Sequence, residues 1–317
     1  MTSKRCSVVV RAYNEAKHIG RLMEGIRQQT LEDSEIVLVD SGSTDDTAAI
    51  AQKYGAKIVR IRPEEFTFGY SLNKGIEAAS GEIIVIASAH VYPVYPDWIE
   101  QLLVPFGNPQ VALVYGKQRG TTTTQFSEHQ VFARWFPDVS DFQQGHPFCN
   151  NANAAVRREL WARHRYDETL TGLEDLAWAK WTLGQGFHLA YIAEAEIIHV
   201  HDEVPHQVYN RYRREAIAFK RIFPEERFTL WNFLRLTTSN TLADCFQALQ
   251  QRNFRVHWRD IAVFRFNQFW GTYRGYRQAG PVTAQLRDTF YYPGETRLRD
   301  ESKRDVLPIQ YDEYERS

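Results

Sequence analysis

The stretch Ile83-Ile84-Val85-Ile86-Ala87-Ser88-Ala89-His90 decides the fold. Its apolar run is too short for a helix and shows no polar alternation, so it predicts a strand that is covered on both faces, as in a parallel sheet. Ser88 and His90 follow this strand directly. Ligands of open α/β sheets bind just beyond the carboxyl ends of the strands, which makes both residues candidates for a site. The alternative for a lone histidine is a turn-capping role.

Three further strands are expected before this one, at 6–10, 35–39 and 57–61. Helices are expected from about His18, after the second strand, and at about 71–79 following a long loop. After the second predicted strand, Ser43 or Thr44 is expected to cap the following helix, with Asp45 or Asp46 in the first turn of that helix. This alternation predicts an α/β fold: a doubly wound, mainly parallel central sheet with helices on both faces.

The composition narrows the function. The 317 residues include 38 Lys and Arg against 39 Asp and Glu, a net charge of −1, so no overall basic field favours nucleic acid. The three cysteines are far apart and form no C-x-x-C pair, which argues against a disulfide framework or a zinc knuckle. We find neither a standard signal segment nor 18 consecutive apolar residues, and expect a cytoplasmic protein.

The first strand ends in Ala12-Tyr13-Asn14-Glu15, where a dinucleotide-binding fold would have G-x-G-x-x-G. A nicotinamide enzyme is therefore disfavoured. A nucleotide base could instead lie against Tyr13 and be held by Asp40, because a carboxylate accepts from a pyrimidine imide N–H. The alternative for Asp40 is an ordinary turn or helix-cap residue.

Two motifs carry a family resemblance: Val9-Val10-Arg11-Ala12-Tyr13-Asn14-Glu15 and Val39-Asp40-Ser41-Gly42-Ser43-Thr44-Asp45. Together with the strand before His90, they resemble the family-2 glycosyltransferases of the GT-A fold over roughly the first 200 residues. The resemblance implies inverting transfer of a sugar from a nucleotide sugar to an acceptor hydroxyl, in polysaccharide or surface-glycan assembly. It also implies that the nucleotide-sugar site includes Ala12, Tyr13, Glu15, Asp40, Asn73, Ser88 and Ala89.

The chain departs from the family pattern in two places. Many relatives have a second aspartate where this chain has Ser41, which leaves the preferred base open. Ser88-Ala89-His90 stands where the family has Asp-x-Asp. The leaving diphosphate needs a divalent cation or fixed positive groups, and imidazole can replace a carboxylate as a ligand for manganese-like ions. We expect Mn²⁺ or Mg²⁺, with a metal-free basic site as the alternative.

Two short strands are predicted at 188–192 and 196–200, and the second ends in Ile198-His199-Val200-His201. His199 and His201 point to one face, because side chains alternate along a strand. With His90 they form a candidate set of metal ligands. The alternatives are hydrogen-bonded histidines, or His201 as a phosphate donor.

Glu174 and Asp175 lie in the first turn of a helix predicted to run to about Gly184. An acceptor hydroxyl needs a nearby carboxylate to take its proton. The resemblance implies that Asp175 is this catalytic base and that Glu174 is a positioning neighbour. The structural alternative is that both acids only interact with the helix dipole.

The sequence divides into a catalytic domain at 1–203, a helical region at 204–293 and a polar tail at 294–317, which we expect to be poorly ordered. The aromatic stretch 126–136 is a candidate acceptor-side wall. The basic residues of helix 204–223 could reach the donor diphosphate or anionic lipid, or form a solvated face. The amphipathic helix 260–278 is expected either to contact the inner membrane surface near a lipid-linked acceptor, or to pack on the catalytic domain or a second subunit of a homo-oligomer.

Two other classes remain as alternatives. A nucleotidyltransferase normally carries a glycine- and lysine-rich phosphate loop after its first strand, and no such loop follows Val10. A non-catalytic glycan- or nucleotide-binding module would explain the missing Asp-x-Asp, but not Glu174 and Asp175. The sequence leaves the donor, the acceptor, the linkage and the oligomeric state open.

Overall fold

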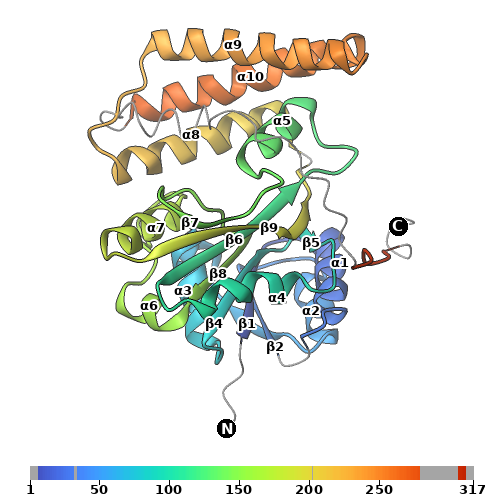
Figure 1. Cartoon of the computed structure of the whole chain (residues 1–317), viewed down its shortest axis with the longest axis vertical. Helices are drawn as coiled ribbons and strands as arrows, with labels where there is room; N and C mark the ends of the chain where they lie inside the picture. Colours follow the sequence, from blue (N-terminus) through green and yellow to red (C-terminus); the bar gives the residue numbers. More distant parts are fainter. Residues whose placement is uncertain (1–5, 32–33, 202, 279–305, 312–317) are drawn as a thin grey trace.

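Within the residues that the structure describes (6–31, 34–201, 203–278 and 306–311), the computed structural model contains one nine-stranded sheet at its centre (Figure 1). The strand order is β3-β2-β1-β4-β8-β6-β9-β5, and β7 pairs with β9. The strands are β1 (Cys6–Ala12), β2 (Ser34–Asp40), β3 (Lys57–Arg60), β4 (Ile83–Ser88), β5 (Val91–Pro93), β6 (Val111–Arg119), β7 (Asp141–Gln144), β8 (Asn153–Arg157) and β9 (His188–His199).

The helices cover both faces of this sheet and continue beyond it. They are α1 (Ala16–Arg27), α2 (Thr47–Lys53), α3 (Phe68–Ala78), α4 (Trp98–Leu103), α5 (Phe126–Trp135), α6 (Arg158–Arg163), α7 (Glu174–Gly184), α8 (Pro205–Ile222), α9 (Leu230–Gln250) and α10 (Phe254–Tyr276), with short 3-10 turns at η1 (Pro63–Glu65) and η2 (Val104–Gly107). The predicted fold class, an α/β sheet with a helical C-terminal extension, is confirmed.

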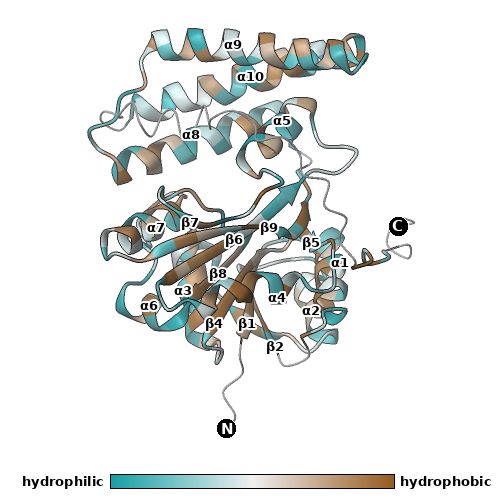
Figure 2. Cartoon of the chain, in the orientation of Figure 1, coloured by the Kyte–Doolittle hydropathy of each residue, from teal (hydrophilic) through white to brown (hydrophobic). Residues whose placement is uncertain are grey.

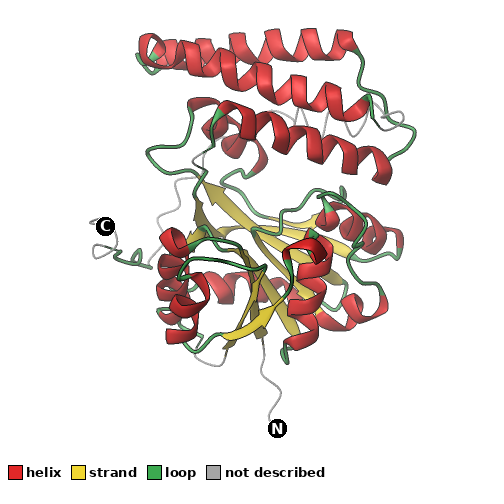
Figure 3. Cartoon of the chain, turned by 180° about the vertical axis from the view of Figure 1, so that it is seen from behind, coloured by secondary structure: helices red, strands yellow, loops and turns green. Residues whose placement is uncertain are grey.

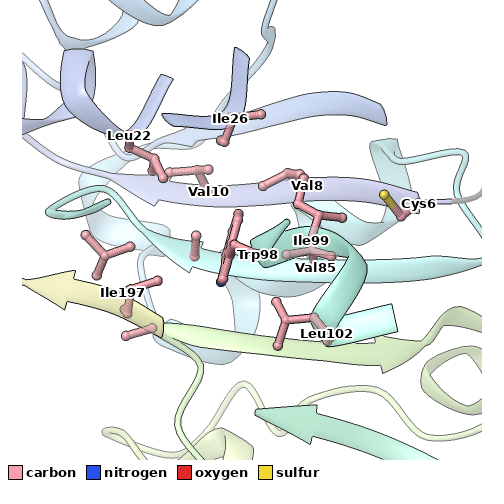
Figure 4. Packing of buried hydrophobic residues seen from close by; sticks show 14 of the residues in the cluster. Cys6, Val8, Val10, Leu22, Ile26, Val85, Trp98, Ile99, Leu102 and Ile197 are labelled. Atoms are coloured by element: carbon pink, nitrogen blue, oxygen red, sulfur yellow. The ribbon is translucent and has the colours of Figure 1, made fainter. Parts of the chain in front are cut away.

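The first four strands are parallel, with β1 between β2 and β4. Their side chains alternate between two cores. Val8 and Val10 pack against α1 and α4 in the core shown in Figure 4, whereas Val9 packs against α3 on the other face. Burying both faces explains the continuous apolar runs, because each fully buried valine or isoleucine contributes about 1.5–3 kcal/mol.

The second half of the sheet is mixed. β8 lies antiparallel between β4 and β6, and β9 runs parallel to β6. The prediction of two separate strands at 188–192 and 196–200 was wrong, because β9 is continuous from His188 to His199. The pairing register between β6 and β9 shifts between Gly116 and Gln118, so the ladder absorbs the irregularity without ending the strand.

Two predicted helix starts differ from the structure. α2 begins at Thr47, after Ser43 and Thr44, so neither caps it. Instead, the Ser43 hydroxyl accepts from the Asn14 amide at 2.9 Å, and Asp45 accepts from the Thr47 amide at 3.0 Å. The exit loop of β2 is therefore held by side chains that bridge it to β1. α3 begins at Phe68, three residues earlier than predicted, because the Thr67 hydroxyl caps it by accepting from the Tyr70 amide.

Helices α8, α9 and α10 form a layer beyond the sheet, with α8 nearest to it and α9 furthest (Figures 1 and 3). A β-carbon added at Gly271 of α10 would lie 2.4 Å from the carbonyl oxygen of Tyr209, so a side chain there would force α8 and α10 apart. The buried Arg265 Nε donates to Asp244 Oδ2 at 2.7 Å, and the Ser127 hydroxyl donates to the same oxygen at 2.6 Å. These bonds tie α5, α9 and α10 together.

The aromatic side chains of the predicted helix 260–278 are buried or half-buried within this layer, except Phe266, which is 48% exposed. Phe264, Phe269 and Tyr276 of α10 are at most 6% exposed. α10 packs between α8 and α9, and a shared apolar cluster joins the layer to Leu170 and Leu176 of the sheet domain. These buried aromatic side chains agree with the expectation that this helix packs on the rest of the protein, and not with the expectation that they contact a membrane. The domain division at residue 203 stays a prediction.

The end of the chain is described over 306–311 only. There, the Tyr311 hydroxyl donates to the Pro93 carbonyl at 2.6 Å and the Ile309 amide donates to the Val94 carbonyl at 3.0 Å. This part of the predicted polar tail therefore packs beside β5, and residues 294–305 and 312–317 lie outside the described residues. None of the described helices is both long enough and apolar enough to cross a membrane.

Candidate active site

A polar cavity of about 600 Å³ opens at the carboxyl ends of β1 and β4, beneath α8. We call it the polar cavity. It gathers side chains from six separate segments of the chain. Its walls include the predicted residues Glu15, Ser88, His90, Glu174, Asp175, His199 and His201, together with Arg11, Phe68, Asn151, Arg211 and Arg214. The structure therefore brings these seven predicted residues together around one cavity, with His90 and Asp175 on the same side of the sheet, and their roles stay predictions. The other predicted residues, Ala12, Tyr13, Asp40, Asn73 and Ala89, do not line it.

Three histidines meet on one wall of the polar cavity. The Nε2 atoms of His199 and His201 lie 3.0 Å apart. His90, His199 and His201 each offer one nitrogen within 4.8 Å of the others. Each ring is held from behind through Nδ1, by Glu15 for His90 at 2.8 Å, by Gln118 for His199 at 2.7 Å and by Glu128 for His201 at 2.7 Å.

This arrangement fits a divalent cation. A carboxylate oxygen can only accept, so Nδ1 carries the proton and Nε2 keeps its lone pair for a metal. Nitrogen ligands at about 2.1 Å from one ion lie roughly 3.0–3.4 Å apart at angles near 90–110°. Burial, reinforced by the nearby His201 and His90, lowers the pKa of His199 well below its usual range, which keeps this imidazole neutral. Three imidazoles suit manganese-like ions better than magnesium.

Glu128 and Arg211 complete the support of His201. Sequence reasoning missed Glu128 and expected Arg211 only as one of the basic residues of helix 204–223 that could reach the diphosphate. Glu128 is 1% exposed and accepts from Arg211 at 2.7 Å as well as from His201. Burial by itself raises the pKa of Glu128, but Arg211 and His201 outweigh it and lower the pKa to about 2. Glu128, His201 and Glu203 are also close enough to share an ion. The Arg211 guanidinium forms ion pairs with both Glu128 and Glu203, however, so the negative charge of these two glutamates is already balanced without a metal ion.

The two acids occupy the first turn of α7, as predicted, and both are buried. The Asn151 amide donates to Asp175 Oδ2 at 3.0 Å. Glu174 Oε1 accepts from Arg11 at 3.4 Å and from the Asn151 side chain at 3.3 Å. Burial, followed by the charge of Glu174, raises the pKa of Asp175 to about 7. A carboxylate with this pKa can take a proton near neutral pH.

Leu173, directly before these acids, has a left-handed backbone with φ of 57°. Side chains other than glycine and asparagine rarely adopt this conformation, which costs about 1–2 kcal/mol. Asn14, directly after Tyr13, has a φ of 54°. Leu173, which lines the polar cavity, is therefore strained, as residues at functional sites often are, whereas Asn14 adopts the conformation at little cost.

A second, aromatic cavity of about 170 Å³ shares seven lining residues with the polar cavity, and Asp175, His199 and His201 are among them. We call it the aromatic cavity. Its apolar walls come from α5, α7, α8 and the segment before β8, and they include Phe132, Trp135, Phe136, Phe148, Leu176 and Phe219. The predicted acceptor-side wall at 126–136 contributes three of these. Asp175 therefore stands where a polar and an apolar compartment meet.

Residues predicted to hold the nucleotide lie around the exits of β1 and β2. Ala12 pairs with Asp40 across the two strands, and Tyr13, which follows, is 55% exposed. Asp40 accepts from the Ser43 amide at 3.1 Å, which is the turn role of the alternative interpretation. Its role in base binding stays a prediction, as does that of Ala12. Ala89 is buried behind Ser88 and His90.

Asn73 does not face the cavity, so the structure contradicts its predicted contact with the diphosphate. Its amide nitrogen donates to the Tyr166 carbonyl at 3.0 Å and to Glu168 at 2.8 Å. Its amide oxygen accepts from the Trp161 indole at 2.9 Å and from the Tyr166 amide at 3.2 Å. Asn73 is 1% exposed and fastens α3 to the segment after α6, so its polar atoms are already used.

Arginines provide positive charge in the polar cavity. The guanidinium carbons of Arg11 and Arg214 lie 4.8 and 4.7 Å from the centre of the Phe68 ring. Both arginines line the polar cavity. The sequence indicated a basic helix at 204–223, but only the fold shows that Arg211 and Arg214 turn inward while Arg221 binds Thr169 outside.

Comparison with known proteins identifies the class. The sequence model of the family described as Glycosyl transferase family 2 matches residues 7–164, about half of the chain. The chain belongs to this family, which confirms the resemblance and the predicted enzyme class. Membership also decides against the nucleotidyltransferase alternative.

Two curated relatives are O-antigen chain rhamnosyltransferases. WbaN of Salmonella anatum is 29% identical over 205 residues, covering 59% of this chain and 62% of the relative. RfbN of Salmonella typhimurium is 24% identical over 222 residues, covering 66% and 70%. Among solved structures, the mannosyltransferase PcManGT from Pyrobaculum calidifontis, in complex with GDP-Man and Mn²⁺, matches with a TM-score of 0.59 at 19% identity, covering 84% of this chain and 85% of that chain. This last likeness shows a shared fold.

Proposed function

We propose that the protein transfers a hexosyl or deoxyhexosyl group from a nucleotide sugar to an acceptor hydroxyl, with inversion at the anomeric carbon. The observation that carries this proposal is the position of Asp175 at the junction of the polar and aromatic cavities. A donor in the polar cavity and an acceptor entering from the aromatic cavity would then approach this carboxylate from opposite sides, which is the geometry that inversion requires.

In this mechanism, the acceptor oxygen attacks the anomeric carbon from the side opposite the diphosphate. The new carbon–oxygen bond forms as the bond to the phosphate oxygen breaks. Asp175 accepts the hydroxyl proton, and the nucleoside diphosphate leaves with the bonding electron pair. Glu174, held by Arg11 and Asn151, keeps the first turn of α7 in place.

The leaving diphosphate gains negative charge during the reaction and must be stabilised. His90, His199 and His201 would hold a divalent cation, and this ion would supply charge neutralisation when bound. Arg11 and Arg214 lie in the same cavity and add fixed positive charge. Glu15 and Glu128 keep two of the histidines oriented through Nδ1.

The rhamnosyltransferase relatives support a 6-deoxyhexose donor and a role in surface-polysaccharide assembly. The chain spans 62% of the length of the first of these relatives, so donor and acceptor are proposed for this chain rather than transferred to it. The aromatic cavity supports an acceptor with an apolar face, such as a deoxysugar ring.

The test is a donor panel with stereochemical readout. The purified protein is incubated with nucleoside diphosphate hexoses and 6-deoxyhexoses, with Mn²⁺, and the released or transferred sugar is followed by proton NMR. We expect one class of donor to be cleaved with inverted anomeric configuration. A retained configuration contradicts the single-base mechanism. Binding of a nucleoside diphosphate without cleavage of any donor favours the non-catalytic module instead.

A further inference from the structure

The outer face of α9 exposes a stripe of large apolar side chains. Trp231, Leu234, Leu242, Phe246 and Leu249 are 49–70% exposed. At 100° per residue they fall within about 120° of the helix circumference, so they share one face. We call these five residues the α9 apolar face. α9 lies at the end of the molecule furthest from the sheet (Figure 1), and hydrophobic positions recur along its length in Figure 2.

The α9 apolar face does not take part in packing inside the helical layer. The opposite side of α9 supplies the buried contacts, through Phe233, Leu236, Asn240, Asp244 and Ala248. The neighbouring α10 adds exposed Trp258, Val263 and Phe266. Soluble monomers rarely leave a continuous apolar surface of this kind uncovered, and such surfaces mark sites of interaction.

The charges around the α9 apolar face are almost all positive. Residues 230–278 contain seven arginines, two aspartates and neither lysine nor glutamate, a net charge of +5 in a chain whose total is −1. Asp244 is buried against Arg265, which leaves Asp260 as the exposed acid of this segment. Arg252, Arg255 and Arg259 cluster where α9 turns into α10, and all three are exposed.

Charge complementarity distinguishes two occupants of this surface. A second copy of the chain in a symmetric contact would bring two basic surfaces together, with few acids to balance them. An anionic lipid surface supplies phosphates for the arginines and a hydrocarbon boundary for the leucine, phenylalanine and tryptophan side chains. Helices with this combination lie in the plane of the membrane interface.

We propose that the α9 apolar face docks on an anionic lipid bilayer, with Arg252, Arg255 and Arg259 contacting its headgroups. This differs from the sequence-based expectation, in which the aromatic face of 260–278 met the membrane, because Phe264, Phe269 and Tyr276 of that helix are buried in the helical layer. The proposal does not depend on the glycosyl-transfer reaction. It places the helical layer between the bilayer and the sheet, with α8 lining the polar cavity on its far side.

The experiment is vesicle co-sedimentation of the full chain, with phosphatidylcholine vesicles and with vesicles that also contain phosphatidylglycerol. We expect binding to the anionic vesicles that weakens as salt is added. The double variant Leu242→Ser/Phe246→Ser should bind at least about tenfold more weakly, because two apolar side chains leave the interface. The matched control Gln247→Ser/Gln250→Ser, on the same helix, should bind as the wild type does.

The triple variant Arg252→Gln/Arg255→Gln/Arg259→Gln tests the same surface without touching an apolar contact, and should lose the preference for anionic vesicles. The proposal is overturned if the wild type ignores anionic vesicles, or if both multiple variants bind unchanged. It is also overturned if analytical ultracentrifugation finds a lipid-free oligomer that Leu242→Ser/Phe246→Ser converts to a monomer, since the face would then be a self-association interface.

Discussion

His199 and His201 bring their Nε2 atoms to 3.0 Å from each other. At this distance the two nitrogens either share a proton or, if both lone pairs point inward, could share a cation, as the proposed function requires. We therefore expect Mn²⁺ to strengthen binding of a nucleoside diphosphate, and His90→Ala to abolish this gain. Calorimetry with Mn²⁺ and with chelator measures this gain in nucleoside diphosphate affinity. The control is His206→Ala, at an exposed position on α8, which should keep the gain.

The carboxylate behind His90 should matter almost as much as the ligand. Glu15→Gln keeps the size of the side chain but weakens the bond to Nδ1, and loss of such a partner typically costs about 10–100-fold in metal affinity. Wild-type nucleotide affinity that is the same with Mn²⁺ and with chelator would instead favour a metal-free site that relies on Arg11 and Arg214.

The pH dependence of turnover should report Asp175. Its pKa is raised to about 7, first by burial and then by the charge of Glu174. The base acts only when ionised, so kcat/KM should rise with pH and level off above about pH 7. Glu174→Gln removes a charge that raises this pKa, so the midpoint should move to lower pH. The exposed Glu159→Gln should leave the midpoint unchanged, and a profile that falls with pH would assign the titration to another group.

The buried pair between Asp244 and Arg265 should dominate the stability of the helical layer. Asp244→Ala leaves a buried guanidinium without its carboxylate, at a cost of about 3–5 kcal/mol in the free energy of unfolding. Urea denaturation measures this cost. Asp260→Ala, an exposed acid on α10, should change stability by less than about 0.5 kcal/mol. Similar losses for both variants would mean that the pair is not the tie between α9 and α10.

Asn73 should matter for stability rather than for donor binding. Asn73→Ala leaves the Trp161 indole and the Tyr166 amide without their acceptor, which costs about 1–3 kcal/mol each when a buried group is left unsatisfied. Nucleotide affinity, measured by calorimetry below the unfolding transition, should stay as in the wild type. Reduced affinity with unchanged stability would restore the role expected from the family. The half-buried neighbour Lys74→Ala, which contributes to none of these bonds, serves as the control.

The parallel half of the fold was readable from the sequence because strands buried on both faces leave continuous apolar runs, as 83–87 does. Helix starts were less readable. Ser43 and Thr44 have the chemistry of helix caps, yet they bridge to Asn14 across the loop instead. The continuity of β9 also escaped prediction, because β9 advances from Ile192 to Ile197 while β6 advances only from Gly116 to Gln118, so the extra residues form an irregularity within one strand instead of a break between two.

The residues of the candidate site also divide into those that the sequence predicted and those that it did not. His90, His199 and His201 were predicted from their positions at strand ends, and Glu174 and Asp175 from the first turn of a helix together with the family resemblance. Glu128 and Arg211 were not, because α5 and α8 reach His201 only through tertiary packing. Asn73 was misplaced for the same reason: the direction of its side chain depends on the segment 161–168, which sequence spacing does not locate.

The most direct test of the central claim is a comparison of Asp175→Asn with the wild type, in sugar transfer and in nucleotide binding. The amide keeps the shape of the side chain but cannot accept the hydroxyl proton as a carboxylate does, so we predict that turnover falls by at least about 100-fold while nucleoside diphosphate affinity stays within about twofold. Transfer by Asp175→Asn at the wild-type rate would contradict the claim that the two cavities meet at the catalytic base.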